Sequence, residues 1–386
     1  MTGTIKPRDA KELLQAVEWA LNDGVTLDVR GSGSKTALGK PMQAGQVLDI
    51  SGLSGIVDYA PEELVVTLRA GTPIREIEAL LAQRNQMLAF EPPDLGPLLG
   101  RAPGEGTLVG AVMGNLAGPR RLSAGAARDH LLGFSGVNGR GEAFKSGGKV
   151  MKNVTGYDLS KLLAGSWGTL AVLDEVSVKV LPAPDQTRTL LLLGLDDEAA
   201  VTAMCDAMGS SHEVSGAAHL PGKTALRIEG VAPSVEARMK GLRELLGGKQ
   251  EELGTQESRT FWRDVRDVKP LATADEAVVW KISCPPTEGP AIVARVRAQR
   301  PAAEAYYDWS GGLVWLALPA NGDADHLLVR GAFGTTGGHA TLIRAAEPVR
   351  AIVPVFHPQS PALAALAQRV KESFDPKSLF NPGRMG

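Results

Sequence analysis

Apolar residues in the first 90 positions recur with the spacings of helices and strands. Between 9 and 24 they follow a helical period, and Asp9 with Glu12 resembles a capping box at the start of that helix. Alternation of apolar and polar residues predicts strands at 25–29, 46–50, 56–59 and 64–70. Thr72 before Pro73 is typical of a helix N-cap followed by proline at the first helical position. This part therefore predicts an alternation of helices and strands.

Beyond residue 89 the chain becomes rich in glycine and proline before strands resume. Further strands are expected at 131–137, 142–146 and 176–181, the first two joined by a turn at 138–141. The segment Pro182-Ala183-Pro184 breaks this pattern. We therefore predict a first domain over 1–182 and a boundary at these prolines.

After Pro184 one order of elements occurs twice. The first copy predicts strand, helix, strand, strand and helix at about 187–193, 197–208, 214–219, 225–229 and 233–246. The second has the same order at about 278–283, 288–299, 304–309, 313–318 and 323–333, with a closing strand near 340–344. Such units build an antiparallel sheet covered by helices. The fold class is therefore α+β, with a second domain over 185–355.

The last segment, 356–386, is too short to form a domain of its own. Ser360 and Pro361 are typical of the start of an amphipathic helix, which we expect to end near Phe374. The tail after Asp375 must dock on another part of the chain. We expect it to return to the first domain.

Charge and cysteine content exclude several classes of protein. The 386 residues carry a net charge of −2, which argues against a nucleic-acid partner, and two cysteines cannot form a disulfide framework. No apolar run approaches the ~20 residues that span a bilayer, and the N-terminus shows no secretory signal. These features predict a cytoplasmic protein with no membrane span of its own.

Glycine is unusually frequent in one basic part of the chain. Sixteen of the 45 glycines lie between Gly100 and Gly168, where nine basic residues outnumber four acidic ones. This pattern is consistent with an anionic ligand held close to the backbone. It is equally consistent with a loop-rich sheet that has a solvated basic face.

Three segments suggest how such a ligand is held. The loop Arg30–Thr36 follows a predicted strand, and its two glycines and two serines allow backbone N–H groups to converge on phosphate. It is neither a Rossmann fingerprint nor a Walker loop, and an ordinary connecting loop remains the alternative. In 107–119, glycines at every fourth position give a helix with a small-residue face, which suits a ligand or close helix packing. In 154–170, Gly165 and Gly168 predict a turn with special dihedral angles before a long strand.

Together these segments resemble the vanillyl-alcohol-oxidase (p-cresol methylhydroxylase, or PCMH) type of FAD-binding fold. Within that superfamily the chain is most similar to the 2-hydroxy-acid dehydrogenase branch, and there to the smaller FAD-binding subunits of bacterial glycolate oxidase complexes. The resemblance rests on the segments 93–96, 107–119, 147–158, 168–170 and 381–384. It spans nearly the whole chain and is looser between 185 and 355. It implies a PCMH-type FAD domain and a cap domain with an antiparallel sheet.

The resemblance also implies which residues hold FAD. Around the pyrophosphate it places Arg30, Gly31, Ser32, Gly33, Ser34 and Lys35. Along the flavin and its ribityl chain it places Pro93, Thr107, Gly110, Asn115 and Gly118, and at the adenine end Val172. Covalent relatives carry a histidine in or beside the first loop, where this chain has Ser34 and Lys35. We therefore expect FAD without a covalent link.

The chain departs from its metal-dependent relatives. No two of its six histidines lie within five residues of each other, so no metal site is expected, and single histidines such as His219 and His339 suit structural roles. No catalytic residue is assigned. Trp309 and Trp315 alternate with apolar residues and predict core packing, whereas Arg121 suits a phosphate, a carboxylate or simple solvation.

The implied function is that of an FAD-carrying subunit in a complex that oxidises glycolate to glyoxylate. Its expected partners are a larger homologous FAD subunit and an iron–sulfur subunit that receives the electrons, with a small 2-hydroxy acid as substrate. Such a complex is cytoplasmic or peripheral to the inner membrane through its partners. The alternatives are a stand-alone FAD-dependent dehydrogenase of D-lactate or another 2-hydroxy acid, and a scaffold that has lost flavin.

Overall fold

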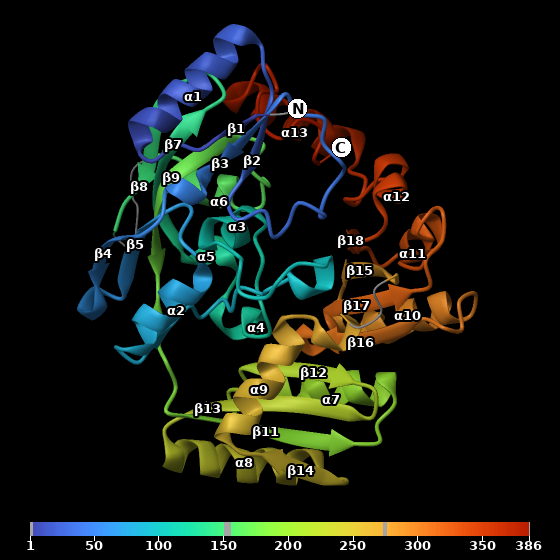
Figure 1. Ribbon diagram of the computed structural model, residues 1–386. Helices are drawn as coiled ribbons and strands as arrows, with labels where there is room; N and C mark the ends of the chain where they lie inside the picture. Colours follow the sequence, from blue (N-terminus) through green and yellow to red (C-terminus); the bar gives the residue numbers. More distant parts are fainter. Residues whose placement is uncertain (1–2, 150–155, 273–275, 386) are drawn as a thin grey trace. The chain divides into compact units, whose positions relative to one another are not determined.

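The computed structural model describes residues 3–149, 156–272 and 276–385, so part of the 147–158 segment lies outside the described residues. The chain forms two compact units (Figure 1). Unit 1 contains residues 1–117, 125–183 and 358–386, and unit 2 contains 118–124 and 184–357. The change of unit at 183/184 falls within the Pro182-Ala183-Pro184 segment. Residues 118–124, which the sequence suggested were part of the FAD domain, group with unit 2.

Unit 1 is built on two main sheets. A parallel sheet has the order β1-β3-β2, with strands β1 (Thr4–Ile5), β2 (Leu27–Arg30) and β3 (Gln46–Asp49). An antiparallel sheet has the order β4-β5-β9-β7-β8, with strands β4 (Ile56–Ala60), β5 (Val65–Arg69), β7 (Leu131–Asn138), β8 (Ala143–Gly147) and β9 (Ala171–Lys179). A short pair joins β6 (Gln86–Met87) to β10 (Leu181–Pro182).

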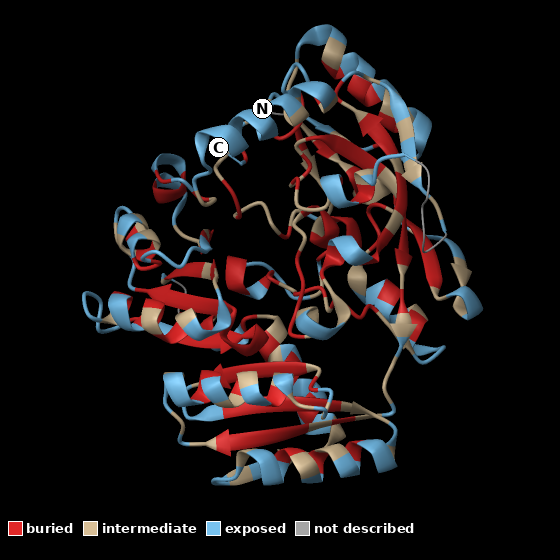
Figure 2. Ribbon diagram, turned by 180° about the vertical axis from the view of Figure 1, so that it is seen from behind, coloured by how far each residue is buried: buried red, intermediate tan, exposed pale blue. Residues whose placement is uncertain are grey.

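Helices surround these sheets in unit 1, and most of them bury apolar residues, whereas α13 has no buried residue. They are α1 (Ala10–Asp23), α2 (Ile74–Ala82), α3 (Leu108–Met113), α5 (Ala127–His130), α6 (Leu159–Leu163) and α13 (Pro361–Phe374). One core joins residues of α1, the strands and the C-terminal Phe380, all of them buried. In Figure 2 buried residues line the strands, and exposed ones lie on the outer turns of the helices.

The predicted start of α1 at Asp9 is confirmed, whereas its capping box and the predicted cap of α2 differ from the structure. At α1 the Asp9 side chain accepts a hydrogen bond from Glu12 N (2.8 Å), but the Glu12 carboxylate accepts from Arg8 N rather than from the cap residue. At α2 the cap residue is Pro73, and Thr72 is not a cap because its hydroxyl donates to Arg69 O (2.7 Å). Gly24 ends α1 with a left-handed conformation, at the position where the helical period of the sequence stops.

The glycine-rich segment 107–119 forms a shorter helix than its four-residue glycine period suggested. Helix α3 ends at Met113, Gly114 is its C-cap and Gly118 lies beyond it in unit 2. The prediction of one helix with Gly110, Gly114 and Gly118 on a common face is therefore wrong. Asn115, at φ 46°, turns the chain away instead.

Unit 2 contains an eight-stranded antiparallel sheet with the order β14-β11-β13-β12-β16-β17-β15-β18. Its strands are β11 (Gln186–Leu193), β12 (Gly216–Leu220), β13 (Lys223–Gly230), β14 (Gln250–Leu253), β15 (Val278–Ser283), β16 (Glu304–Asp308), β17 (Leu313–Leu318) and β18 (His339–Arg344). The order strand, helix, strand, strand, helix occurs twice, as predicted.

Most helices of unit 2 pack on one face of this sheet. The helices of the unit are α4 (Arg121–Ala124), α7 (Asp197–Gly209), α8 (Ala232–Leu246), α9 (Thr255–Arg266), α10 (Gly289–Arg297), α11 (His326–Gly331) and α12 (Glu347–Ile352). Helix α9 was not predicted and packs on the other face, where Trp262 Nε1 donates to Thr189 Oγ1 (2.8 Å). The sheet therefore has helical cover on both faces at its β11 end. No helix among the described residues is long and apolar enough to span a membrane.

The tail after α13 packs into unit 1 beside strand β2. Leu27 N donates to Leu379 O (2.8 Å), and Asn381 N donates to Leu27 O (2.9 Å). Asp375 fixes the turn before it, since its buried carboxylate accepts from Leu379 N, Phe380 N and Lys371 Nζ. The tail thus reaches the loop that follows β2.

Candidate functional site: a glycine-lined anion pocket

The loop after β2 forms one wall of a pocket in unit 1. Thr36 N and Thr36 Oγ1 both donate to Gly33 O (3.2 and 3.1 Å), which folds the loop into a turn. Gly33 has φ +77°, a conformation that side chains with a Cβ rarely adopt. The sequence therefore needs glycine here for the loop to turn back on itself.

Consecutive backbone N–H groups of this loop are available to a ligand. The N–H groups of Ser32, Gly33, Ser34 and Lys35 donate to no acceptor among the residues that the structure describes. A run of free backbone donors in a turn forms a concave site for an anion. Backbone N–H groups without an acceptor cost free energy, and this cost is removed when phosphate oxygens accept their hydrogen bonds.

Helix α3 begins against this loop, and glycine lets the two approach closely. The Thr107 hydroxyl caps the helix by accepting from Gly110 N (3.2 Å). A Cβ added at Gly31 would lie 2.9 Å from Thr107 Oγ1, and one added at Gly110 would lie 3.0 Å from it. A larger residue at Gly31 would therefore push the loop away from the start of the helix, whereas one at Gly110 would crowd the Thr107 cap and the Lys35 side chain.

Lys35 places a cation in the pocket. Its Nζ lies 3.3 Å from Ser34 Oγ and 3.5 Å from the position that a Gly110 Cβ would take. Burial lowers the pKa of Lys35 to about 8, Asp94 opposes this effect and Arg384 adds to it. An anion beside this ammonium group would raise the pKa again and hold Lys35 in its charged form.

Arg30 lies beside the loop, but its positive charge is less available to a ligand than its position in the sequence suggests. Its guanidinium forms an ion pair with Asp28, with Nε 2.7 Å from Oδ2. The side chain lines the pocket while its charge is already partly balanced. Lys35 is therefore the stronger counter-charge for a ligand.

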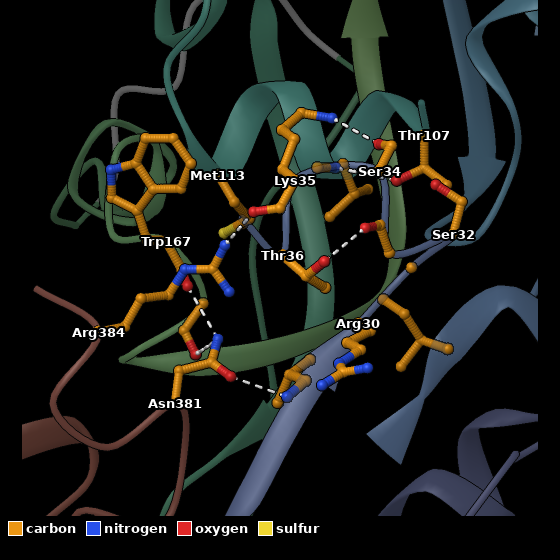
Figure 3. A pocket seen from close by; sticks show the side chains of 17 residues that line it. Arg30, Ser32, Ser34, Lys35, Thr36, Thr107, Met113, Trp167, Asn381 and Arg384 are labelled. Carbon is orange, nitrogen blue, oxygen red and sulfur yellow. Dashed lines mark hydrogen bonds between the residues drawn. The ribbon is translucent and has the colours of Figure 1, made fainter. Parts of the chain in front are cut away.

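The C-terminal tail supplies the opposite wall, which sequence reasoning did not place in the site. Asn381 Oδ1 accepts from Val29 N (2.8 Å), and its Nδ2 donates to Trp167 O (2.9 Å). Arg384 donates to Lys35 O (3.0 Å), and its guanidinium lies 5.7 Å from the centre of the Trp167 ring. Figure 3 shows these side chains converging on the loop. The sequence indicated only that the tail returns to the first domain and that 381–384 resembles the family, and neither signal placed Asn381 or Arg384 in the pocket.

The turn before β9 also reaches the pocket. Gly165 and Gly168 have φ +93° and +69°, the special dihedral angles that the sequence predicted, and Trp167 N donates to Met113 O (2.9 Å). This bond ties the turn to the end of α3. Trp167 and Gly168 thereby form part of the lining.

The pocket is open to solvent, and the free space between its walls together with the solvent at its mouth measures about 610 Å³. It is lined by Val29, Arg30, Gly31, Ser32, Gly33, Ser34, Lys35, Thr36, Ile50, Thr107, Val109, Gly110, Met113, Trp167, Gly168, Asn381 and Arg384. A cradle of free amides, glycines and one lysine fits a diphosphate group well.

Four of the residues suggested by the resemblance lie outside this lining. Pro93 is buried next to Asp94, whose carboxylate accepts from Gly104 N (2.6 Å). Asn115 Oδ1 accepts from Arg128 N (3.1 Å), and Val172 is buried in β9. The carbonyl of Gly118 accepts from Trp309 Nε1 (3.0 Å) within unit 2. Their roles toward a flavin remain proposals.

Comparison with known proteins agrees with this geometry. Residues 1–147 match the family model described as "FAD binding domain". The glycolate oxidase subunit GlcE of Escherichia coli is 38% identical over 376 residues, which cover 97% of each chain. The glycolate oxidase subunit GlcD of Bacillus subtilis is 32% identical over 52% of this chain and 42% of its own.

Solved structures show the same fold at low sequence identity. A p-cresol methylhydroxylase structure has a TM-score of 0.76 and 12% identity, covering 99% of this chain and 88% of its own. An alkyldihydroxyacetonephosphate synthase structure has a TM-score of 0.70 and 16% identity, covering 98% and 75%. The fold is therefore the PCMH-type fold that the sequence predicted. The full-length match with GlcE shows that this chain belongs to the GlcE family of FAD-binding oxidoreductase subunits.

Proposed function

We propose that this chain is the FAD-binding subunit of a glycolate oxidase complex and that its anion pocket holds the pyrophosphate of FAD. The observation that carries the site assignment is the run of free N–H groups at 32–35 beside the Lys35 ammonium. The full-length similarity to a glycolate oxidase subunit supports the choice of reaction. When bound, FAD supplies the two-electron acceptor for the oxidation of a 2-hydroxy acid.

The residues of the pocket have distinct tasks in this proposal. The amides at 32–35 donate hydrogen bonds to the phosphate oxygens, and Lys35 Nζ keeps its proton and balances their charge. Gly31 lets the loop lie against Thr107 at the start of α3, and Gly110 leaves room for the Lys35 ammonium group. Asn381 and Arg384 hold the tail against the loop and limit access of water to the diphosphate.

We also propose that FAD is bound without a covalent bond. The described residues that line the pocket include no histidine, cysteine or tyrosine that would serve as an attachment point. Acid precipitation of the purified protein should therefore release yellow flavin into the supernatant. Flavin that stays with the precipitate would overturn this part of the proposal.

The partners follow from the same relatives. GlcE and GlcD are both named as subunits of glycolate oxidase, and this chain resembles both. We propose a larger homologous FAD subunit and an iron–sulfur subunit as partners, the latter accepting the electrons. Purification at native expression level, with the co-purifying chains identified, would test this assembly.

The decisive experiment measures flavin reduction with and without the larger subunit. The FAD-loaded chain alone, mixed anaerobically with excess glycolate or D-lactate, should bleach slowly or not at all, whereas added larger subunit should restore bleaching. Fast bleaching of the single chain would favour a stand-alone dehydrogenase, as D-lactate dehydrogenase of Anaerostipes hadrus (31% identical over 43% of this chain) suggests. A purified chain without flavin absorbance would favour the scaffold.

A further inference from the structure

Helix α13 of unit 1 carries a continuous apolar stripe. Its larger apolar residues recur at spacings of three or four positions and share one side of the helix: Leu363, Leu366, Val370 and Phe374. Such a stripe normally faces a protein core along its whole length. In α13 only the second half of the stripe does so.

The C-terminal half of α13 is anchored to unit 1. Val370 and Phe374 are half-buried and pack against its apolar core, and the ring centres of Phe374 and Phe144 lie 6.2 Å apart. Lys371 Nζ donates to Thr169 O (2.6 Å). These contacts hold the end of the helix against the unit.

The N-terminal half of α13 is uncovered, although it belongs to the same stripe. Leu363 is 57% exposed and Leu366 is 49% exposed, and every residue of 361–369 is classed with them as exposed (Figure 2). The Ser360 side chain does not cap the helix, and α13 buries none of its residues. Helices of this length are marginal in water without tertiary packing. This half therefore gains stability when another surface covers it.

The uncovered half has the composition of an interface core. No Lys, Arg, Asp or Glu occurs between Arg350 and Arg369, whereas the solvent-facing side of a helix usually carries charged residues. Depletion of charged residues is typical of the core of protein–protein interfaces. Small side chains surround the two leucines, with alanine at positions 362, 364, 365 and 367. They let the surface of a partner approach the helix closely.

Composition and relatives together indicate what kind of surface covers this half. Helices that lie on a membrane combine bulky apolar residues with many basic ones, whereas α13 is rich in alanine and its Lys371 is paired with Asp375 (2.6 Å). GlcE and GlcD are named as two different subunits of glycolate oxidase. This favours contact with a different chain over contact with a second copy.

We propose that residues 361–368 form a docking face and that Leu363 and Leu366 insert into an apolar groove of the larger FAD subunit. The identity of this partner rests on the proposed function. The docking face extends about 12 Å along a helix about 10 Å wide and so offers roughly 120 Å². A stable interface takes about 800 Å² from each partner. The two leucines are therefore anchors within a larger contact.

The test measures binding of the full chain to the larger FAD subunit of the same organism. Both chains are purified, and their affinity is measured by biolayer interferometry. In the double variant Leu363→Asp/Leu366→Asp two carboxylates stand on the docking face, so the affinity should fall at least about hundredfold. Flavin content and thermal unfolding of the isolated variant should match those of the wild type, because the isolated chain leaves this face in water.

Two variants and one measurement on the wild type serve as controls. Leu245→Asp changes a leucine of helix α8 that is 51% exposed and lies outside the docking face, and it should leave the affinity unchanged. Leu366→Met keeps an apolar side chain of similar size and should retain most of the affinity. In the wild type, hydrogen–deuterium exchange of the backbone amides at 362–368 should slow when the larger subunit is added.

The outcomes separate the docking face from the proposed function. Unchanged affinity of the double variant, or unchanged exchange at 362–368 in a complex that forms, would overturn the inference alone. If the double variant does not fold, the exchange measurement on the wild type decides. No binding between the wild type and the larger subunit would overturn both the inference and the proposed partner. Absence of flavin from the isolated chain would count against the proposed function only.

Two further measurements identify another occupant of the docking face. Light scattering that shows a wild-type dimer and a monomeric double variant would assign the face to a second copy. Vesicles of phosphatidylcholine and phosphatidylglycerol that bind the wild type and not the double variant would assign it to lipid. Either result, together with unchanged affinity for the larger subunit, would overturn the inference.

Discussion

At the scale of single residues, Lys35 and Gly33 show how the pocket depends on small features. The ammonium group of Lys35 is largely removed from water, and the lowered pKa records the cost of its charge. Gly33 contributes no side chain, yet its left-handed conformation orients the neighbouring backbone N–H groups toward the pocket. Lys35 thus supplies the charge, and Gly33 sets the direction of the hydrogen-bond donors.

Binding of FAD should weaken as the pH rises through about 8. Without FAD, Lys35 loses its proton near that pH. The bound diphosphate raises the pKa of Lys35 and keeps it charged. The affinity for FAD is therefore highest below pH 8 and falls above it. Dissociation constants measured between pH 6.5 and 9 would show this step. In Lys35→Met, affinity at pH 7 should be about tenfold lower or more and the step should vanish. Parallel pH profiles for both proteins would contradict the role of Lys35.

Gly33→Val should lose FAD while most secondary structure remains. A branched side chain at φ +77° is strained and obstructs the amides that face the ligand. Gly222, in the β12–β13 turn of unit 2, has the same φ of +77° and nothing within 4 Å of an added Cβ. Gly222→Val is thus the control for strain alone and should keep its FAD. Equal flavin content in Gly33→Val and wild type would show that the loop does not bind the cofactor.

At the scale of elements, the pocket is the meeting point of a strand end, a helix start, a turn and the C-terminal tail. Strand β2 delivers the loop, α3 begins beside it, and the 165–168 turn is tied to the end of α3. Asn381 connects the tail to β2 and to that turn through side-chain hydrogen bonds. The tail is therefore a structural part of the site.

Asn381→Ala should lower the free energy of unfolding by about 1–3 kcal/mol, since Val29 N and the carbonyls of Trp167 and Gly168 lose their partner inside the protein. Urea unfolding of the two proteins measures this change. Asn381→Asp keeps the acceptor for Val29 N and loses the donor. It should destabilise the fold at least as much as Asn381→Ala, because a buried carboxylate oxygen then faces the carbonyls of Trp167 and Gly168, and it should also weaken FAD binding through repulsion of the diphosphate. A smaller loss of FAD in Asn381→Asp than in Asn381→Ala would argue against an anion in the pocket.

Local patterns predicted the elements well, but they could not predict which elements meet. The boundaries of α1 and the repeated units of the second half follow from spacing and from caps such as Gly24, which act over a few residues. The loop at 31–35 could be predicted from the sequence, because glycines and serines directly after a strand are typical of a loop that binds phosphate through its backbone N–H groups. Asn381 and Arg384 act on residues about 350 positions earlier, and no periodicity encodes such a contact. The end of α3 was misjudged because a glycine period does not reveal where a helix stops.

At the scale of the whole molecule, the chain passes between the two units more than once. Residues 118–124 leave unit 1, join unit 2 and return before β7. Arg120 anchors this segment by donating to Glu229 Oε1 and Oε2 (2.6 and 2.9 Å). Burial raises the pKa of Glu229, but Arg227 and Arg120 outweigh it and hold that pKa below its ordinary value.

Arg120→Ala should lower the free energy of unfolding by about 3–5 kcal/mol, because it leaves the buried Glu229 carboxylate with less compensation. Arg243→Ala, which breaks a more exposed Arg–Glu pair in the same unit, should cost about 1 kcal/mol or less. Because the pKa of Glu229 is lowered on folding, the stabilisation is present at neutral pH and is lost as the pH falls below about 4.3. Similar losses for the two variants at pH 7 would contradict this assignment.

The contact between the tail and the first loop also sets an order of events during synthesis of the protein. Lys35 is made early, whereas Arg384, which donates to its carbonyl oxygen, is made 349 residues later. At about 5–20 residues per second the ribosome needs roughly 20–70 s to cover that distance. Throughout this time unit 1 lacks one wall of its pocket. The pocket is thus completed only after translation has reached the tail, and chains that stop earlier lack the residues that form its second wall.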